Sequence, residues 1–201
     1  MNTPLVATGT RIRNPFTLET FIFTHPCEDP AETRFDVNLE PGGVSAGNEA
    51  HHIHPLADEY FTVREGRLRV FLDGKAHEIG PGETVMVPRG TPHYFRNGHD
   101  GETYFHIRFT PGQQFLRFFL NMALGPATLT ELYDAKGDAP LLLQALFFRA
   151  FPDHAYKAGQ SVFVQKAAIS LLAPLGRLAG YRLPIPPAPR ERLPHPEMLR
   201  A

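Results

Sequence analysis

The sequence predicts a mainly β protein, a barrel or jelly-roll sandwich, followed by a helical extension. From about residue 16 to residue 110, short runs that alternate apolar and polar residues follow one another between Gly and Pro turns. One of these turns is Asp73-Gly74, a strong hairpin signal because type I′ turns need positive φ. After Thr110-Pro111-Gly112 the apolar residues recur at helical spacing. Many short antiparallel strands joined in this way are typical of barrels and sandwiches.

The bulk composition excludes several classes of protein. The 201 residues are 42% hydrophobic and 20% charged with a net charge of −1, so no global field favours binding to nucleic acid. The single cysteine, Cys27, forms no intramolecular disulfide, in keeping with a reducing compartment. The N-terminus lacks the features of a signal peptide, and no window reaches about 18 uninterrupted apolar residues. We therefore expect a soluble, cytoplasmic protein.

The strands are predicted from β-branched and aromatic content and from alternation. Residues 16–24 form the first such run, and from Arg34 onward Phe35, Val37 and Leu39 share one face. Further strands are predicted at about 50–54, 59–64, 67–72, 76–79, 84–87, 92–95 and 103–109.

Three helices are predicted in the extension. The first covers 113–124 and stops at Gly125-Pro126. The second covers 141–151, with Asp138 as N-cap and Pro152 as its end. The third covers about 160–172, and Pro174 kinks or ends it before 175–181. The predicted organisation is thus a β-barrel with an N-terminal strand over 1–111, a helical extension over 112–183 and an extended Pro-rich tail over 184–201.

Three histidines and one glutamate form a candidate metal-ligand set. In a strand, residues i and i+2 point to the same face, so His52 and His54 project together while His51 faces the other way. Glu59 begins the next strand, and His93 begins another after a Pro-Arg-Gly turn. Three imidazoles and one carboxylate suit a divalent transition ion, whereas calcium or magnesium would want more oxygen ligands.

The spacing of these residues resembles that of the cupins. His52-x-His54-x4-Glu59-x6-Gly66 resembles the first motif of that family, and Gly82-x5-Pro88-x-Gly90-x2-His93-x3-Asn97 matches the second. The glycine that the family usually has ahead of the first histidine is missing, since position 46 is Ala46 and Gly47 is one place off. This departure concerns a turn and not a ligand.

The resemblance covers about residues 35–110, and the 15 residues between the two motifs are similar to the spacer of small microbial single-domain cupins. It implies a cupin-type jelly-roll β-barrel that binds one metal ion inside through His52, His54, Glu59 and His93. The ions expected are Fe²⁺ or Mn²⁺, with Ni²⁺, Co²⁺, Cu²⁺ or Zn²⁺ as further possibilities.

Strand parity suggests which residues surround this metal. Phe61 and Val63 share the face of Glu59, and Phe95 shares that of His93, so these three are expected inside the barrel and Tyr60 and Tyr94 outside.

The last barrel strand leaves two orientations open. It alternates Tyr104, His106 and Arg108 with phenylalanines and an isoleucine. If the polar set faces inward, His106 is the candidate general base or hydrogen-bond donor to a ligand, and Tyr104 and Arg108 orient an anionic substrate. In the alternative, the polar set faces solvent or a partner subunit and the apolar residues fill the barrel.

The extension has three interpretations. Its central run, 141–151, is hydrophobic nearly all round, which predicts burial on more than one side. The interpretation ranked first is that it packs on the barrel or on a sister subunit in a homodimer. The second is that it forms a lid over the metal pocket. A membrane-surface contact ranks last, although residues 166–201 carry six Lys/Arg against two Glu. These runs are too apolar for a DNA-binding helix pair.

The function expected from the resemblance is that of a metal-dependent enzyme with oxygenase-type chemistry on a small hydrophobic or aromatic molecule. Non-redox isomerase or cyclase chemistry, in which the metal polarises a carbonyl, is an alternative. A second alternative is a non-catalytic small-molecule-binding or sensor protein. A sugar isomerase or epimerase is weakened by the lack of an evident pocket Lys/Arg cluster.

Overall fold

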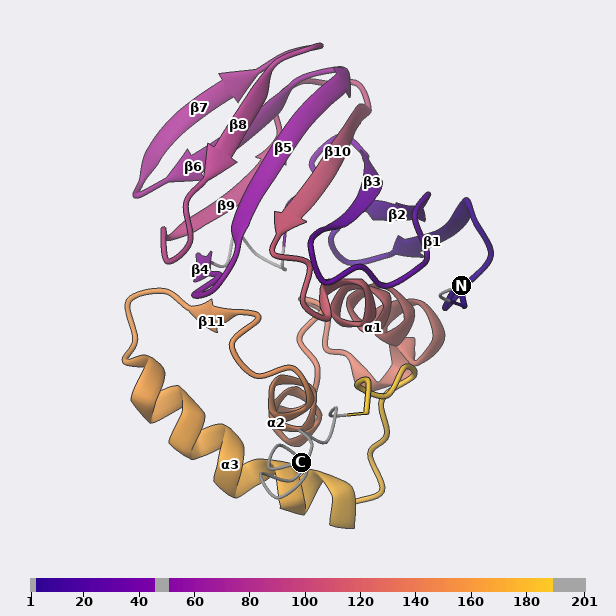
Figure 1. The fold of residues 1–201 in the computed structure, drawn as a ribbon, viewed down its shortest axis with the longest axis vertical. Helices are drawn as coiled ribbons and strands as arrows, with labels where there is room; N and C mark the ends of the chain where they lie inside the picture. The colour runs from indigo at the N-terminus through magenta and orange to yellow at the C-terminus, as the bar shows by residue number, and fades with distance from the viewer. Residues whose placement is uncertain (1–2, 46–50, 190–201) are drawn as a thin grey trace, which may run out of the picture.

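Two antiparallel sheets face each other in the computed structural model, which describes residues 3–45 and 51–189 (Figure 1). The six-stranded sheet has the order β1-β2-β3-β10-β5-β8, and the five-stranded sheet has the order β11-β4-β9-β6-β7. The strands are β1 (Thr10–Asn14), β2 (Glu19–Phe23), β3 (Thr33–Leu39), β4 (His52–Ile53), β5 (Asp58–Glu65), β6 (Leu68–Leu72), β7 (Lys75–Ile79), β8 (Thr84–Val87), β9 (His93–Asn97), β10 (Thr103–Thr110) and β11 (Tyr156–Lys157). The predicted β unit with a helical extension is confirmed, and β1 and β11 are strands that the sequence did not indicate.

The helices that follow the barrel are α1 (Phe115–Thr128), a 3₁₀ turn (Thr130–Leu132), α2 (Leu141–Ala150) and α3 (Val162–Leu178). One predicted helix end, at Gly125-Pro126, is wrong, and of the two effects expected of Pro174, a kink or an end of the helix, the end does not occur. α1 continues through Gly125-Pro126, and α3 continues through Pro174. In α3, packing explains the continuity, because Ala173 and Gly176 on either side of Pro174 are buried and Gly176 lies against α2.

Asp138 does not cap α2. The cap position is Pro140, and the side chain of Gln144 instead donates to the carbonyl oxygen of Ala139. Proline is favoured near a helix start because its φ is already close to the helical value, and its side chain forms no cap hydrogen bond here.

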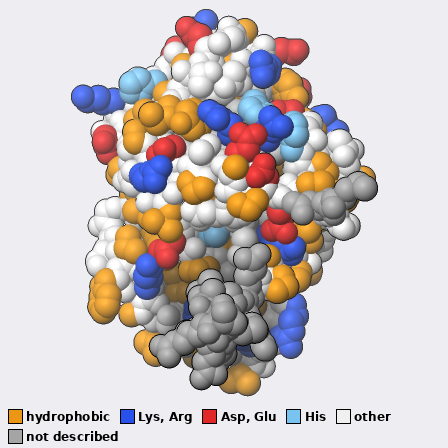
Figure 2. Space-filling view, viewed as in Figure 1, with side chains coloured by type: hydrophobic (Ala, Val, Ile, Leu, Met, Phe, Trp, Pro, Cys, Tyr) orange, Lys and Arg blue, Asp and Glu red, His pale blue; other side chains and the backbone are white. Residues whose placement is uncertain are grey.

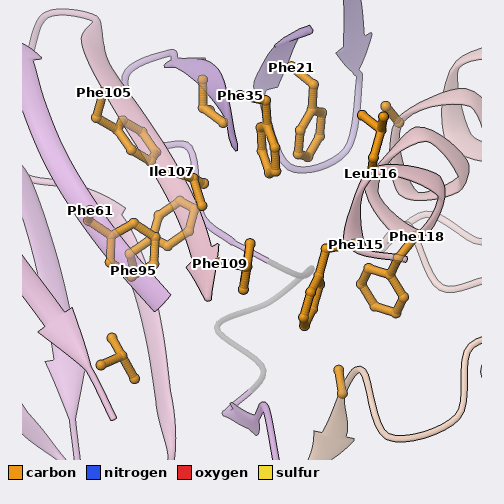
Figure 3. Close-up of a cluster of buried hydrophobic side chains, with 14 of the residues drawn as sticks. Phe21, Phe35, Phe61, Phe95, Phe105, Ile107, Phe109, Phe115, Leu116 and Phe118 are labelled. Atoms are coloured by element: carbon orange, nitrogen blue, oxygen red, sulfur yellow. The ribbon is translucent and has the colours of Figure 1, made fainter. Parts of the chain in front are cut away.

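A cluster of phenylalanines joins the barrel to α1 (Figure 3). The ring of Phe109 on β10 stacks on that of Phe115 at the start of α1, with centroids 4.1 Å apart. The ring of Phe119, one turn later in α1, has its centroid 4.7 Å from that of the Phe35 ring on β3. The first helix of the extension therefore shares one hydrophobic core with the six-stranded sheet.

The sidedness predicted for the inner strands is confirmed. Phe61, Val63 and Phe95 are buried in the core, and the ring of Tyr94 stacks on Phe71 on the other face of the five-stranded sheet. The apolar residues of β10 fill the barrel, since Phe105, Ile107 and Phe109 are all buried.

Gly112 sits where the barrel passes into the extension, and it tolerates no side chain. A Cβ there would meet the carbonyl oxygen of Asp29 at 2.0 Å and the backbone of Glu32 at 2.5 Å. We expect Gly112→Ala to lower the free energy of unfolding by about 1–3 kcal/mol, measured by urea denaturation, because backbone atoms must move apart.

Gly80→Ala is the matched control, since a Cβ at Gly80 meets its nearest atom only at 3.8 Å. Equal stability of the two variants would show that the junction around Gly112 is not tightly packed.

Candidate metal centre

Three strands from two sheets bring the four predicted ligands together. His52 on β4 lies opposite His93 on β9 in the antiparallel ladder, and Glu59 comes from β5 of the other sheet. His54 follows β4 after one residue and is 3% exposed. One ligand atom from each of the four residues lies within 4.8 Å of the others. Two ligands about 2.0–2.2 Å from one ion are at most about 4.4 Å apart, so the four atoms lie close to the spacing that a single metal requires.

The hydrogen bonds of the two most buried histidines fix their tautomers. His54 Nδ1 donates to the carbonyl oxygen of His154 (2.5 Å), and His93 Nδ1 donates to that of Thr91 (2.8 Å). Because a carbonyl only accepts, each Nδ1 carries the proton and each Nε2 of the neutral ring is left as an acceptor. This is the arrangement in which a histidine binds a metal through Nε2.

The Nε2 atoms point at the carboxylate of Glu59. Oε2 of Glu59 lies 2.8 Å from Nε2 of His93 and 3.5 Å from Nε2 of His54. These three buried atoms have no hydrogen-bond partner among the described residues. Buried acceptors facing one another are costly without a proton or a cation between them, so the residues fit a divalent ion.

The charges in the cluster are strongly coupled. Burial opposes the charge of Glu59, but the imidazoles of His54 and His93 outweigh it and hold the pKa of Glu59 at about 2. Burial also lowers the pKa of His93, and the nearby carboxylate of Glu59 outweighs this and raises the pKa above its ordinary value. A carboxylate that stays ionised at low pH is suited to hold a cation.

The C-terminal extension contributes directly to the cluster. β11 pairs with β4, so that Lys157 lies opposite His52, and Ala158 N donates to the carbonyl oxygen of His51 (3.0 Å). His154, just before β11, supplies the carbonyl that holds His54.

The ring of His154 also ties the extension together. Its Nδ1 donates to the carbonyl oxygen of Pro152 and its Nε2 accepts from Gln114 N. Burial lowers the pKa of His154 to about 4, so the ring is neutral near pH 7, as these bonds require. No local pattern in the sequence indicates this contact, because His154 is 100 residues from His54.

The polar residues of β10 lie away from the cluster. Tyr104, His106 and Arg108 occupy the face opposite the buried phenylalanines, which is the second of the two orientations considered. Tyr104 Oη and His106 Nδ1 bind the two carboxylate oxygens of Asp36 (2.7 and 2.8 Å), and Arg108 lies over the ring of Tyr60. The structure therefore does not bring these three side chains to the metal ligands.

A buried carboxyl that the sequence reasoning missed is Glu19 on β2. It is 4% exposed and shares a face with the core residues Phe21 and Phe23. Burial raises its pKa to about 8, and the charge of Glu59 adds to the rise. A signal existed in the sequence, since Glu19-Thr20-Phe21-Ile22-Phe23 alternates with Glu19 on the aromatic face.

Of the remaining motif positions, the structure describes Asn97 but not the position of the missing glycine. The side chain of Asn97 stabilises a turn: its Nδ2 donates to the backbone carbonyl oxygens of Leu39, Glu40 and Gly101. Ala46 and Gly47 lie outside the described residues. Within the described chain, no helix is long and apolar enough to cross a membrane.

Comparison with known proteins places residues 35–107 under the family model described as "Cupin domain". "Polyketide synthase CurC" of Streptomyces cyaneus is 36% identical over 62 residues, which are 31% of this chain and 40% of the relative. "Protein SchB" of Streptomyces halstedii is 33% identical over 60 residues, 29% of this chain and 44% of the relative. The chain thus spans less than half the length of either curated relative.

Similar folds occur among solved structures. KdgF from Halomonas sp. is 18% identical with a TM-score of 0.44, covering 52% of this chain and 91% of that one. A sugar phosphate isomerase of the cupin superfamily from Silicibacter pomeroyi is 26% identical with a TM-score of 0.41, covering 47% and 60%. The family match spans most of the segment from β3 to β10, which includes the strands that carry the ligand cluster, and this part of the chain, residues 35–107, is a cupin domain.

Proposed function

We propose that this protein is a metal-dependent enzyme with oxygenase-type chemistry on a small hydrophobic or aromatic molecule. The observation that carries the proposal is the cluster of His52, His54, Glu59 and His93, of which the last three are buried and hold three acceptor atoms without hydrogen-bond partners in the described part of the chain. A divalent transition ion held by four protein ligands keeps one or two octahedral positions for substrate or dioxygen, and Fe²⁺ and Mn²⁺ are the ions favoured.

The surroundings of the cluster favour an apolar substrate. The rings of Phe109 and Phe115 meet the edge of His54 with centroids 5.1 and 5.4 Å away. The basic side chain of β10, Arg108, is on the outer face, where its guanidinium lies 4.1 Å from the centre of the Tyr60 ring. A phosphorylated sugar would need cationic partners in the pocket, whereas a hydrophobic molecule gains from aromatic walls.

The protein residues have distinct roles in this proposal. His154 and Thr91 hold the imidazoles of His54 and His93 in the tautomer that leaves Nε2 toward the ion. Phe109 and Phe115 exclude water from one side of the cluster, which strengthens electrostatic interactions there. Glu19, whose raised pKa leaves it protonated near pH 7, is a carboxylic acid that can give a proton within the core.

A non-redox isomerase or cyclase is the second candidate, and the relative named as a polyketide synthase favours it. Polyketide chemistry is chemistry of carbonyl compounds, and a bound ion polarises a carbonyl without any change of oxidation state. A non-catalytic metal-containing sensor is the alternative outside enzymes.

The ligand set predicts a bound metal. The purified protein is expected to contain about one transition-metal ion per chain by elemental analysis, and His93→Ala is expected to lose it, because one of four ligands is removed. His77→Ala is the control, since His77 is exposed on β7 and outside the cluster. Absence of stoichiometric metal from the wild type would refute the proposed function, and metal retained in His93→Ala would refute the ligand set.

The chemistry is tested on the metal-loaded enzyme with a panel of small aromatics and diketones. We expect substrate-dependent dioxygen uptake that His93→Ala abolishes. Product formed without dioxygen uptake would favour the isomerase or cyclase, and a metal-loaded protein that binds these compounds without turnover would favour the sensor.

A further prediction concerns the pairing of β11, in the extension, with β4. Ala158→Pro removes the N–H that donates to His51, next to His52, so the β4–β11 pairing is weakened. We expect metal affinity about 10–100-fold lower, as is usual when groups that orient metal ligands are lost. Affinity is measured by competition with a chelator. Ala158→Ser keeps the N–H and should bind metal as the wild type does; an equal loss in both variants would contradict the role of the strand pairing.

A further inference from the structure

A second cavity lies in the extension, away from the metal cluster. It is enclosed by the later turns of α1, by α2, by the turn between β1 and β2, and by residues 182–184. Its volume of about 160 Å³ is close to that of engineered cavities that hold a benzene ring. None of the four metal ligands lines it.

The cavity has an apolar body and one polar end. Its walls include Met122, Leu143 and Phe147. At the polar end, Thr17 and Asn14 are each 5% exposed. Oγ1 of Thr17 has no hydrogen-bond partner among the described residues, and the hydroxyl of Thr17 approaches the Glu19 carboxyl without meeting hydrogen-bond geometry. Leaving a buried hydroxyl unpaired is costly, which points to a ligand atom at this position.

The hydrogen-bonding capacity at this end defines the ligand. Oδ1 of Asn14 already accepts from Phe16 N and Thr17 N, so the group that Asn14 can offer to a ligand in the cavity, which Thr17 also lines, is its Nδ2 donor. We propose that this cavity binds a neutral molecule of one-ring size whose carbonyl oxygen accepts from Thr17 and Asn14. This site is independent of the proposed function, because its walls and its polar end are separate from the metal ligands.

Acetophenone and ethylbenzene test this proposal, since they differ by the carbonyl oxygen alone. We expect the metal-loaded protein to bind acetophenone at least about fivefold more tightly by calorimetry, a ratio within the range of one buried hydrogen bond. Thr17→Val should remove most of this preference. Ala139→Leu, which fills the cavity from its rim, should abolish binding, and Ala127→Leu, exposed on α1 and outside the lining, should not.

Circular dichroism is used to check that each variant folds. Thr17→Val tests the polar end of the cavity, and Ala139→Leu tests its apolar space. No binding of either compound, or binding that survives Ala139→Leu, would overturn the proposal. Binding lost in His93→Ala would also overturn it, by placing the compound at the metal centre.

An independent observation concerns the outer face of α3. Eight exposed apolar residues fall within an arc of about 140° at 100° per residue and are called the α3 stripe here. The α3 stripe consists of Phe163, Val164, Ala167, Ala168, Leu171, Pro174, Leu175 and Leu178. Phe163, Leu171 and Leu178 are 80%, 75% and 84% exposed. α3 forms the outer edge of the molecule, and Figure 2 shows hydrophobic side chains along that edge.

The area and the charge of the α3 stripe indicate what kind of partner binds it. The large side chains of the stripe expose roughly 600 Å² of apolar surface, the upper end of what monomers leave in one patch. Two such surfaces would bury roughly 1,200 Å² together, enough for a stable interface.

The charge of α3 argues against a lipid surface as the occupant. Helices that bind anionic lipid are rich in basic residues. α3 carries two, Lys166 and Arg177, and Lys166 is paired with Asp153 (2.7 Å).

We infer that the α3 stripe is the interface with a second copy of this chain. A groove between α2 and α3, lined by Leu141, Phe148 and Leu172, borders the stripe at Ala168. One copy can therefore offer both a protruding row and a hollow to the other, which a two-fold arrangement requires.

Sedimentation of the full chain from about 1 to 100 μM tests this interface. We expect a dimer, and we expect Leu171→Glu and, separately, Leu178→Glu to raise the dissociation constant at least about 100-fold, because a charge is buried in each. Met86→Glu is the matched control, since Met86 is 45% exposed on β8 of the barrel. A monomeric wild type, or a dimer that both stripe variants leave unchanged, would overturn the inference. So would a monomer that sediments with anionic phospholipid vesicles through the same residues.

Discussion

The structure depends on the convergence of acceptor atoms at one buried point. Nε2 of His54, Nε2 of His93 and Oε2 of Glu59 face one another without protons between them when the rings are neutral. Such a group of lone pairs is stable only around a cation, whether a metal ion or extra protons. Each Nδ1–H donation to a backbone carbonyl reinforces this, because it fixes which nitrogen is turned toward the centre.

The carbonyl that holds His54 belongs to the extension, so the barrel and the helices form one functional unit. β11 pairs with β4, the start of α1 stacks on Phe109, and the ring of His154 links the loop after α2 to Gln114. Of these contacts, the pairing of β11 with β4 joins residues about 100 positions apart in the chain. A change in the extension is therefore felt by the ligands through hydrogen bonds rather than through a direct contact with the ion.

The two faces of β10 show how a charged surface and an apolar interior divide one strand. The phenylalanines contribute to a core that continues into α1, while His106 and Tyr104 both bind Asp36 on the outer face. Burying Arg108 and His106 beside the metal would have required partners for their charges inside the barrel. The outer face satisfies them with Asp36 and the Tyr60 ring at little cost in desolvation.

The sequence by itself determined the strands other than β1 and β11, the sidedness of β5 and β9, and the grouping of His52, His54, Glu59 and His93. These follow from the two-residue period of a strand and from motif spacing, both of which are local properties of the chain. Only the tertiary structure decided which face of β10 turns inward, that α3 continues through Pro174, and that β11 and His154 complete the cluster. Each of these outcomes is set by contacts between segments distant in sequence, where burial and hydrogen bonding outweigh local preference.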